Sequence, residues 1–299
     1  MNGEILKKKI FLDLRGGLAN QLFQWATVSI WAEHHGYQLV IKDDYVSRPG
    51  NPGNQLKHLV DIKPRRKIIT DAFLWQVLFA VAPRKIYYKL NWSTGHIKNP
   101  FVKYAGSLIE LDQLWERKVR VFHARGLFQN SDYLADWRTR IRDVLIPALR
   151  RYGQNLEFPF GGIHVRRGDY VTDKEILAAF GSCTENYYKG AIDKMKPNLP
   201  LFVFTDDRQW AQETFLKTFK GKEIALSPQG NHFKDLYALS CAKEIVMANS
   251  TFSWWAYFLS DAELVFAPSP WFDDKDHDQN LTGQNWTFLG KTSGELLSL

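Results

Sequence analysis

The chain has 299 residues, of which 45% are hydrophobic, 24% charged and 14% aromatic, and its net charge is +7. This composition excludes an intrinsically disordered protein and supplies enough apolar side chains for one large domain or two ordinary ones. Two cysteines, Cys183 and Cys241, are too few for a disulfide scaffold. The positive charge favours an anionic partner such as nucleotide phosphates, nucleic acid or an acidic membrane surface.

The first half of the chain begins with a strand–turn–helix–strand pattern. The apolar run at 9–14 predicts a buried strand, Arg15-Gly16-Gly17 a tight turn, 20–35 an amphipathic helix, and 37–41 a second strand. Such a βαβ unit favours a parallel sheet. Further along, the composition predicts a loop over 43–60, an apolar helix flanked by basic runs over 71–90, and a strongly basic helix over 132–149.

The alternation of strands and helices restarts after Phe158-Pro159-Phe160. Apolar runs predict strands at 162–165, 201–204, 244–248 and 264–267, with helices between them at 184–196, 208–219, 233–242 and 253–260. We therefore expect an α/β protein with two Rossmann-like lobes, 1–155 and 156–299, and a cleft between them.

Polar clusters follow the expected strands of the second lobe, and ligands of open parallel sheets bind at such strand ends. The first cluster is His164-Val165-Arg166-Arg167-Gly168-Asp169-Tyr170. A guanidinium group offers a planar fork for phosphate oxygens, and strand alternation sends Arg166 and Arg167 to different sides. The alternative is a structural ion pair between one of these arginines and Asp169.

Two further clusters end the next strands. Asp206 and Asp207 can accept hydrogen bonds from a nucleotide base or ribose, or Asp207 can simply cap the following helix. The segment Asn249-Ser250-Thr251-Phe252-Ser253 offers hydroxyl and N–H groups at a strand-to-helix turn, which suits a phosphate or a helix cap without a ligand.

The turn Arg15-Gly16-Gly17-Leu18-Ala19-Asn20 lacks the glycine spacing of a dinucleotide fingerprint, but it presents Asn20 at a helix start. No acidic cluster, including Asp43-Asp44 and the run at 273–278, has a convincing metal-ligand spacing. We therefore expect no metal site. No nucleic-acid module accompanies the basic helix, so nucleic acid is not expected as a partner.

Four segments together resemble glycosyltransferase family 11, the α-1,2-fucosyltransferases. They are GGLANQLFQWA at 16–26, HVRRGDYV at 164–171, LFVFTDD at 201–207 and NSTFSWWAYFL at 249–259. They follow the order of the family's motifs. Ala19 departs from the pattern, since the family usually has glycine there, which leaves the detailed geometry of the turn open.

The resemblance implies a GT-B-like fold and an inverting, metal-independent transfer of L-fucose from GDP-β-L-fucose to the 2-hydroxyl of a terminal galactose on a glycan. It implies that Arg166 contacts the pyrophosphate and that Arg167 lies nearby or braces the motif. It further implies contacts of His164 and Asp207 with guanosine, Asp206 being a competitor, and of Ser250 and Thr251 with the β-phosphate. Phe252, Ser253 and Gly17 are expected to line the substrate site, and Asn20 to reach the reacting centre.

The chemistry of fucose transfer requires the kind of residues found in these motifs. Negative charge grows on the β-phosphate as GDP leaves, so a metal-free enzyme needs fixed cationic and N–H donors there. Direct displacement also needs a base on the acceptor hydroxyl. Asp169 is our candidate, with Asp173 and Glu175 behind it, and an oxocarbenium-like mechanism without a strong base is the alternative.

Two other functions remain open at this point. One is the same fold acting on another GDP-sugar or acceptor hydroxyl, and the other is a non-catalytic glycan-binding protein.

The sequence also leads to an expectation about where in the cell the protein is located. No apolar run reaches the roughly 18 residues that span a bilayer, and the first residues lack the features of a signal peptide. A cytoplasmic protein is expected, either without membrane contact or peripheral on the anionic inner face of the membrane. In the second case the helix over 71–90 would rest on the membrane, where a lipid-linked acceptor of an O-antigen-type polysaccharide is presented. A buried helix explains the same pattern.

Overall fold

The computed structural model describes residues 8–61, 103–153, 158–219, 221, 223–228, 231–273 and 281–298. Within them the chain forms two compact units. The first is drawn from 1–15, 28–54 and 61–128, and the second from 16–27, 55–60 and 129–299. The helix expected over 71–90 lies outside the described residues. No described helix is long and apolar enough to cross a membrane.

The described strands of the first unit form a parallel four-stranded sheet in the order β2-β1-β4-β3. Its elements are β1 (Lys9–Asp13), β2 (Gln38–Lys42), β3 (Tyr104–Ala105), α4 (Leu108–Glu116) and β4 (Val121–Ala124). Ile10 and Leu12 of β1 are fully buried on one face of the sheet. Helix α1 (Leu18–His34) contributes residues to both units. The expected βαβ unit is confirmed, whereas β3, β4 and α4 were not predicted.

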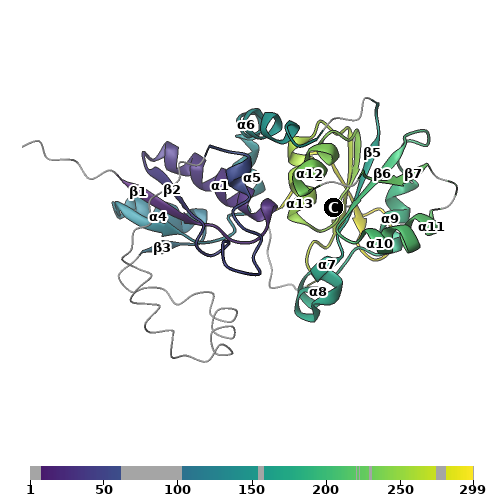
Figure 1. The fold of residues 1–299 in the computed structure, drawn as a ribbon, viewed down its shortest axis with the longest axis horizontal. Coiled ribbons are helices and arrows are strands. Elements are labelled where there is room, and N and C mark those ends of the chain that lie inside the picture. Colours follow the sequence, from purple (N-terminus) through teal and green to yellow (C-terminus); the bar gives the residue numbers. More distant parts are fainter. Residues whose placement is uncertain are drawn as a thin grey trace, which may run out of the picture. The chain divides into compact units, whose positions relative to one another are not determined.

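The second unit contains a parallel six-stranded sheet (Figure 1) in the order β10-β9-β8-β5-β6-β7. Its strands are β5 (Gly161–Val165), β6 (Leu201–Thr205), β7 (Ile224–Leu226), β8 (Glu244–Val246), β9 (Leu264–Ser269) and β10 (Trp286–Gly290). When the strands are numbered from β5 along the chain, their order in the sheet is the doubly wound order of a dinucleotide-binding fold. The strand order reverses between β5 and β8, so the sheet has a topological switch point there.

Helices cover both faces of this sheet, and α7 (Gly168–Thr172) and α8 (Lys174–Phe180) lie at its edge (Figure 1). The other helices after β5 are α9 (Glu185–Ile192), α10 (Arg208–Trp210), a π-helical turn (Ala211–Phe215), α11 (Leu216–Thr218), α12 (His232–Ser240) and α13 (Thr251–Leu259). A short 3-10 turn, η1 (Leu56–His58), also belongs to this unit. Tyr187 and Tyr188 of α9 are buried in the core. The predicted α/β class with two parallel sheets is confirmed.

The expected basic helix is two helices, α5 (Ser131–Ala135) and α6 (Arg138–Arg150), and both belong to the second unit. Arg138 donates to the backbone carbonyls of Phe258 and Ser260, and Arg142 makes a bidentate ion pair of 2.5 and 2.6 Å with Asp261. These arginines therefore satisfy the carbonyl end of α13. These contacts agree with the grouping of 129–153 with the second unit, which differs from the expected boundary at 155.

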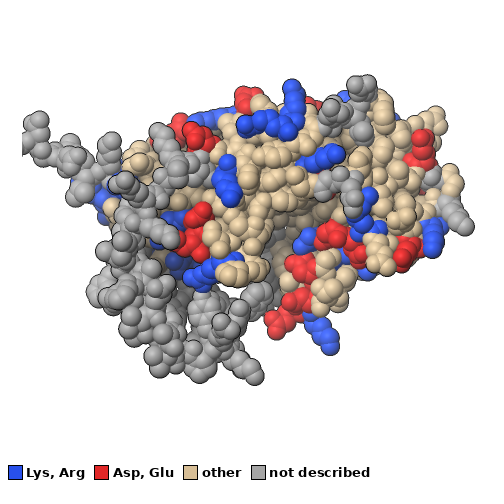
Figure 2. Space-filling view, in the orientation of Figure 1, with Lys and Arg blue, Asp and Glu red and all other residues tan. Residues whose placement is uncertain are grey.

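Basic side chains are visible along α6 in the space-filling view (Figure 2), and acidic and basic groups lie next to one another elsewhere on the second unit. The face drawn there shows no large field of one sign over the described residues of this unit.

Candidate active site

Two of the polar sequence motifs flank the switch point of the second sheet. The segment Arg166–Asp169 follows β5, and Asn249–Thr251 follows β8, the strand paired with β5. Asp206 and Asp207 follow β6, which pairs with β5 on its other side. Because all of these strands are parallel, the three segments emerge at the same edge of the sheet. This is the place where doubly wound sheets bind ligands.

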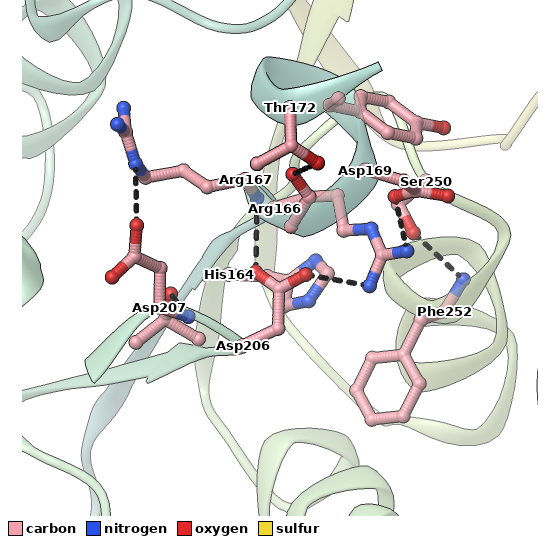
Figure 3. Close-up of polar contacts among 12 residues, drawn as sticks. His164, Arg166, Arg167, Asp169, Thr172, Asp206, Asp207, Ser250 and Phe252 are labelled. Atoms are coloured by element: carbon pink, nitrogen blue, oxygen red, sulfur yellow. Dashed lines mark hydrogen bonds and ion pairs between the residues drawn. The ribbon is translucent and has the colours of Figure 1, made fainter. Parts of the chain in front are cut away.

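Arg166 lies between two carboxylates (Figure 3). Its Nη2 is 2.6 Å from Oδ1 of Asp169 and its Nη1 is 2.7 Å from Oδ2 of Asp206. The arginine is one-third exposed. The ion pair with Asp169 that the sequence left as an alternative is therefore present, and a second carboxylate joins it. Any phosphate that binds Arg166 has to compete with these groups or replace them.

Arg167 points away from Arg166 (Figure 3). Its Nε donates to Asp207 at 3.1 Å, and its guanidinium lies 3.9 Å from the ring centroid of Trp210. The arginines lie beyond the end of β5, yet their side chains leave in different directions, as expected. Arg167 thus braces the segment against α10, which is one of the two roles that the resemblance implied. The stacking partner Trp210 was not predicted, because nothing in its sequence neighbourhood distinguishes it.

Asp206 and Asp207 have different local tasks. Asp207 caps α10 by accepting from the backbone N–H of Trp210 at 3.1 Å, as the helix-cap interpretation predicted. Asp206 accepts from the backbone N–H of Arg167 at 2.9 Å. It therefore holds the backbone of Arg167 as well as the side chain of Arg166. A Cβ at position 168 would lie 2.5 Å from Oδ2 of Asp206, which explains the glycine at that position.

His164 is buried in β5 beneath this edge. Its Nδ1 lies 2.5 Å from Oγ of Ser253, and Oγ also accepts from the backbone N–H of Ala248 at 3.1 Å. Burial and the nearby charge of Arg166 lower the pKa of His164 to about 3, so the ring is neutral at physiological pH. We expect the hydroxyl proton of Ser253 to point to Nδ1, which would leave the imidazole proton on Nε2.

Ser253 is itself fully buried and its hydroxyl is occupied by these two partners. It was expected to line the substrate site, but in this structure it contacts His164 instead. Phe252 packs on the same ring, with centroids 5.1 Å apart.

The turn after β8 ties several elements together. Ser250 caps α13 by accepting from the backbone N–H of Phe252 at 3.3 Å (Figure 3). The side chain of Asn249, buried before it, donates to the carbonyls of Phe180, Gly181 and Trp271. Its own carbonyl accepts from the hydroxyl of Tyr170 at 3.1 Å. Asn249 therefore holds α7 and α8, which follow Arg167, against the start of α13.

Asn20 lies in the same unit as this turn. The hydroxyl of Thr251 donates to Oδ1 of Asn20 at 3.2 Å, and Gln129 donates to the same oxygen at 2.9 Å. Gly16 has a φ of +68°, so the glycine-rich turn needs its freedom at that position. Gly17 is exposed just before α1, and a Cβ there would meet no atom within 4 Å.

Ala19 departs from the family pattern without disturbing the turn. It lies in the first turn of α1, where a Cβ is accommodated, and its carbonyl accepts from Trp255 at 2.9 Å. Gln129 was not predicted, because it is distant in sequence from every motif and only the fold brings it to Asn20.

Among the described residues, no group of three His, Cys, Asp or Glu side chains is arranged to hold a metal ion. The carboxylates at the edge of the sheet are bonded to arginines and backbone N–H groups instead. Metal independence remains a prediction that needs a measurement.

The comparison with protein families decides the assignment. The sequence model of the family described as "Glycosyl transferase family 11" matches residues 85–290. The chain belongs to this family. Three of the four segments, at 164–171, 201–207 and 249–259, fall within the matched residues, whereas 16–26 precedes them. The resemblance seen in the sequence is confirmed.

Relatives of this glycosyltransferase family 11 chain include an alpha-1,2-colitosyltransferase of Escherichia coli, which is 32% identical over 163 residues, covering 50% of this chain and 56% of the relative. A galactoside alpha-(1,2)-fucosyltransferase 1 of Bos taurus is 24% identical over 271 residues, covering 85% of this chain and 67% of the relative. The chain thus matches about half the length of the first of these relatives.

One solved structure supports the fold. The protein described as POFUT1 in complex with GDP-fucose has a TM-score of 0.50 and 13% sequence identity, with 85% of this chain and 95% of that chain covered. At this identity the likeness concerns the fold alone, and it agrees with the expected GT-B-like class.

Proposed function

We propose that this chain is an inverting α-1,2-fucosyltransferase, which moves L-fucose from GDP-β-L-fucose to the 2-hydroxyl of a terminal galactose without a metal ion. The observation that carries the proposal is the placement of Arg166 and of the Ser250-Thr251 turn on either side of the switch point. Family membership and the names of the fucosyltransferase relatives support the choice of sugar. In this proposal the second unit binds the donor and the first unit serves the acceptor.

In this proposal, a fixed positive charge and fixed hydrogen-bond donors stabilise the diphosphate of GDP-fucose. Arg166 supplies a permanent positive charge, while Ser250, Thr251 and the first N–H groups of α13 supply hydrogen bonds. His164 contacts the guanosine through its protonated Nε2, with Asp206 and Asp207 holding the arginines around it. Removing one donor of this kind typically lowers the rate by a factor of about 10²–10³.

Asp169 is the proposed base. Its carboxylate takes the proton of the galactose 2-hydroxyl as that oxygen bonds to C1 of fucose, and the bond from C1 to the β-phosphate oxygen breaks to release GDP. Nη2 of Arg166 donates to Asp169 at 2.6 Å. A diphosphate that takes over Arg166 would release Asp169 for the acceptor, which couples donor binding to formation of the base. Asn20, bonded to Thr251, would orient the reacting groups.

The test compares Arg166→Ala with Arg142→Ala, which removes an arginine bonded to Asp261 in the same unit. Transfer to galactose-terminated disaccharides, hydrolysis of GDP-fucose and the thermal unfolding midpoint are measured for both. We expect Arg166→Ala to lose transfer and hydrolysis with the fold intact, and Arg142→Ala to retain both activities. Near-normal turnover by Arg166→Ala would end the assignment.

Linkage analysis of the product tests the position of the new bond. Activity should persist in EDTA, and a complete loss that Mn²⁺ restores would overturn metal independence. A chain that binds GDP-fucose or galactosides but consumes no donor would instead be a glycan-binding protein.

A second candidate donor is an activated colitose, because one relative is an alpha-1,2-colitosyltransferase. Colitose is fucose without its 3-hydroxyl, and a site built to bond a hydroxyl can reject the sugar that lacks it by a large factor. Competition between equal concentrations of the two GDP-sugars separates the candidates. The ratio of the two products gives the ratio of their kcat/KM values.

The biological setting is proposed from another relative, whose name is "O-antigen biosynthesis glycosyltransferase WbnK". A lipid-linked polysaccharide intermediate presented at the inner face of the membrane would be a fitting acceptor. Co-sedimentation of the full chain with anionic liposomes at low salt tests this location. Absence of the chain from the pellet would dismiss it.

A further inference from the structure

A second polar cluster lies at the carboxyl edge of the first unit's sheet, outside the site described above. Asp13 ends β1, His123 lies in the neighbouring strand β4, and Arg125 follows that strand. Nδ1 of His123 is 3.1 Å from Asp13, and both Nε and Nη2 of Arg125 are 2.9 Å from the same carboxylate. The carboxyl edge of a parallel sheet is where α/β folds place their ligands.

Tyrosine rings support the guanidinium groups of this cluster. Arg125 lies 4.5 Å from the ring centroid of Tyr104 in β3, and Arg15 lies 4.5 Å from that of Tyr45. Arg48 lies over the same Tyr45 ring at 5.6 Å. A guanidinium stacked on a ring presents its N–H groups in its own plane, the geometry that suits a carboxylate or phosphate. Tyrosine rings also offer apolar surface to a sugar.

Charge in the described cluster is biased toward the positive. Three guanidinium groups, those of Arg15, Arg48 and Arg125, accompany the carboxylate of Asp13. Burial and then the charge of Arg125 lower the pKa of Arg15. Burial raises the pKa of Asp13, but His123 and Arg125 outweigh it and leave the value below its ordinary level. Arg15 and Arg125 are partly buried, whereas Arg48 is exposed. Bringing the two partly buried charges together costs free energy, which a bound anion would offset.

We propose that Arg15, Arg48 and Arg125 form a subsite for a negatively charged substituent of the acceptor saccharide, either a sugar carboxylate or a phosphate. Tyr45 and Tyr104 hold the guanidinium planes, and Asp13 fixes the orientation of Arg125. This inference rests on the proposed function, because it names the class of acceptor. It gives the chain a preference for acidic over neutral galactosides.

The experiment measures binding by isothermal titration calorimetry to the full chain in the presence of GDP, so that no transfer is required. The three probes are lactose, the matched disaccharide in which glucuronic acid replaces glucose, and lactose 1-phosphate. We expect one of the two acidic probes to bind at least about tenfold more tightly than lactose, as one or more charge-assisted hydrogen bonds would give. Which of them does so identifies the anion as a carboxylate or a phosphate.

Substitutions test whether Arg15, Arg48 and Arg125 cause the preference for acidic probes. Arg15→Gln should abolish the preference for the acidic probe and leave lactose binding unchanged, while Arg15→Lys should retain part of it. The control is Arg120→Gln, which removes the same charge from an exposed arginine before the other end of β4. Equal binding of all three probes to the unmodified chain, or a preference that survives in Arg15→Gln, would overturn the subsite.

The same measurements separate this inference from the proposed function. Selective, Arg15-dependent binding without any fucose transfer would keep the subsite and remove the fucosyltransferase assignment. Transfer to lactose and to the acidic probes with equal KM values would keep the assignment and remove the subsite.

Discussion

Oγ of Ser253 lies 2.5 Å from Nδ1 of His164, in a contact buried beneath the polar edge of the second sheet. The hydroxyl also accepts from the backbone N–H of Ala248. We expect its own proton to point to Nδ1, because no other acceptor for that proton is described, which would leave the imidazole with a donor at Nε2. A buried serine would then control the hydrogen-bonding character of His164.

We predict that Ser253→Ala raises the KM for GDP-fucose about tenfold with a smaller effect on kcat, because His164 loses the partner that fixes its tautomer. The ¹⁵N shifts of the imidazole check the cause, since they should change from a single Nε2-protonated form to a mixture. Ser240→Ala is the control. Ser240 is also buried and donates to a backbone carbonyl, but it is bonded to Tyr237 within α12. An unchanged tautomer in Ser253→Ala would contradict the assigned role.

The neutral state of His164 makes folding depend on pH. Its pKa is about 3 in the folded chain because of burial and Arg166, against 6.5 as the ordinary value. The unfolded chain therefore binds a proton that the folded chain does not, so the stability is fully present above pH 6.5 and is lost as the pH falls toward 3. Between pH 7 and 5 this amounts to about 2 kcal/mol. Urea unfolding of the unmodified chain and His164→Gln at both pH values should show this difference, and parallel losses would refute it.

The two carboxylates that hold Arg166 should respond differently to neutralisation. Asp169→Asn removes the proposed base and should lower kcat by at least about 100-fold while the KM for GDP-fucose changes little. Asp206→Asn keeps the base but loosens Arg166 and the backbone of Arg167, so it should act mainly on that KM. The acidic limb of the pH–kcat profile should disappear in Asp169→Asn alone. Equal effects of both variants would mean that Asp169 only positions Arg166.

Asn20 and Thr251 should behave as a coupled pair. A double-mutant cycle with Asn20→Ala and Thr251→Val, read as kcat/KM, should give an interaction free energy of about 0.5–2 kcal/mol, because their side chains share a hydrogen bond. The control cycle pairs Asn20→Ala with Ser240→Ala and should be additive. Additivity in the first cycle would indicate that the two residues act independently.

Lys291 should be a stability determinant although it is distant in sequence from the motifs. Only 1% of its side chain is exposed, and its Nζ lies 2.6 Å from both the carbonyl of Phe180 and Oδ1 of Asp273. We expect Lys291→Met to lower the free energy of unfolding by about 1–3 kcal/mol, since it leaves the carbonyl at the end of α8 without this donor. Lys42→Met, which removes a lysine paired with the exposed Asp44, is the control and should change the free energy of unfolding by less than about 0.5 kcal/mol. Equal behaviour of the two variants would refute the claim.

The sequence by itself determined the α/β class, most elements of the second unit and the identity of the polar segments at its strand ends. It could do so because buried parallel strands are short continuous apolar runs, and because polar groups after such strands are conspicuous. Strands β3, β4, β7 and β10 were missed. In β3 and β7, two or three residues carry no usable periodicity. The four residues of β4 and five of β10 lie in segments where no strand was predicted. The expected helix over 132–149 was divided at Asp136–Trp137, which no local pattern marked.

Partnership between distant side chains was decided only by the tertiary structure. The sequence placed Ser253 at the substrate, whereas the fold buries its hydroxyl against His164. It likewise left open whether Arg166 is ion-paired, and the parallel strands β5 and β6 bring Asp206 to it as a second carboxylate. Nor did it connect Asp13 with Arg125, which are 112 residues apart. Such contacts depend on the order of the strands in the sheet and on the direction of each side chain. Neither can be predicted from the local pattern of residues.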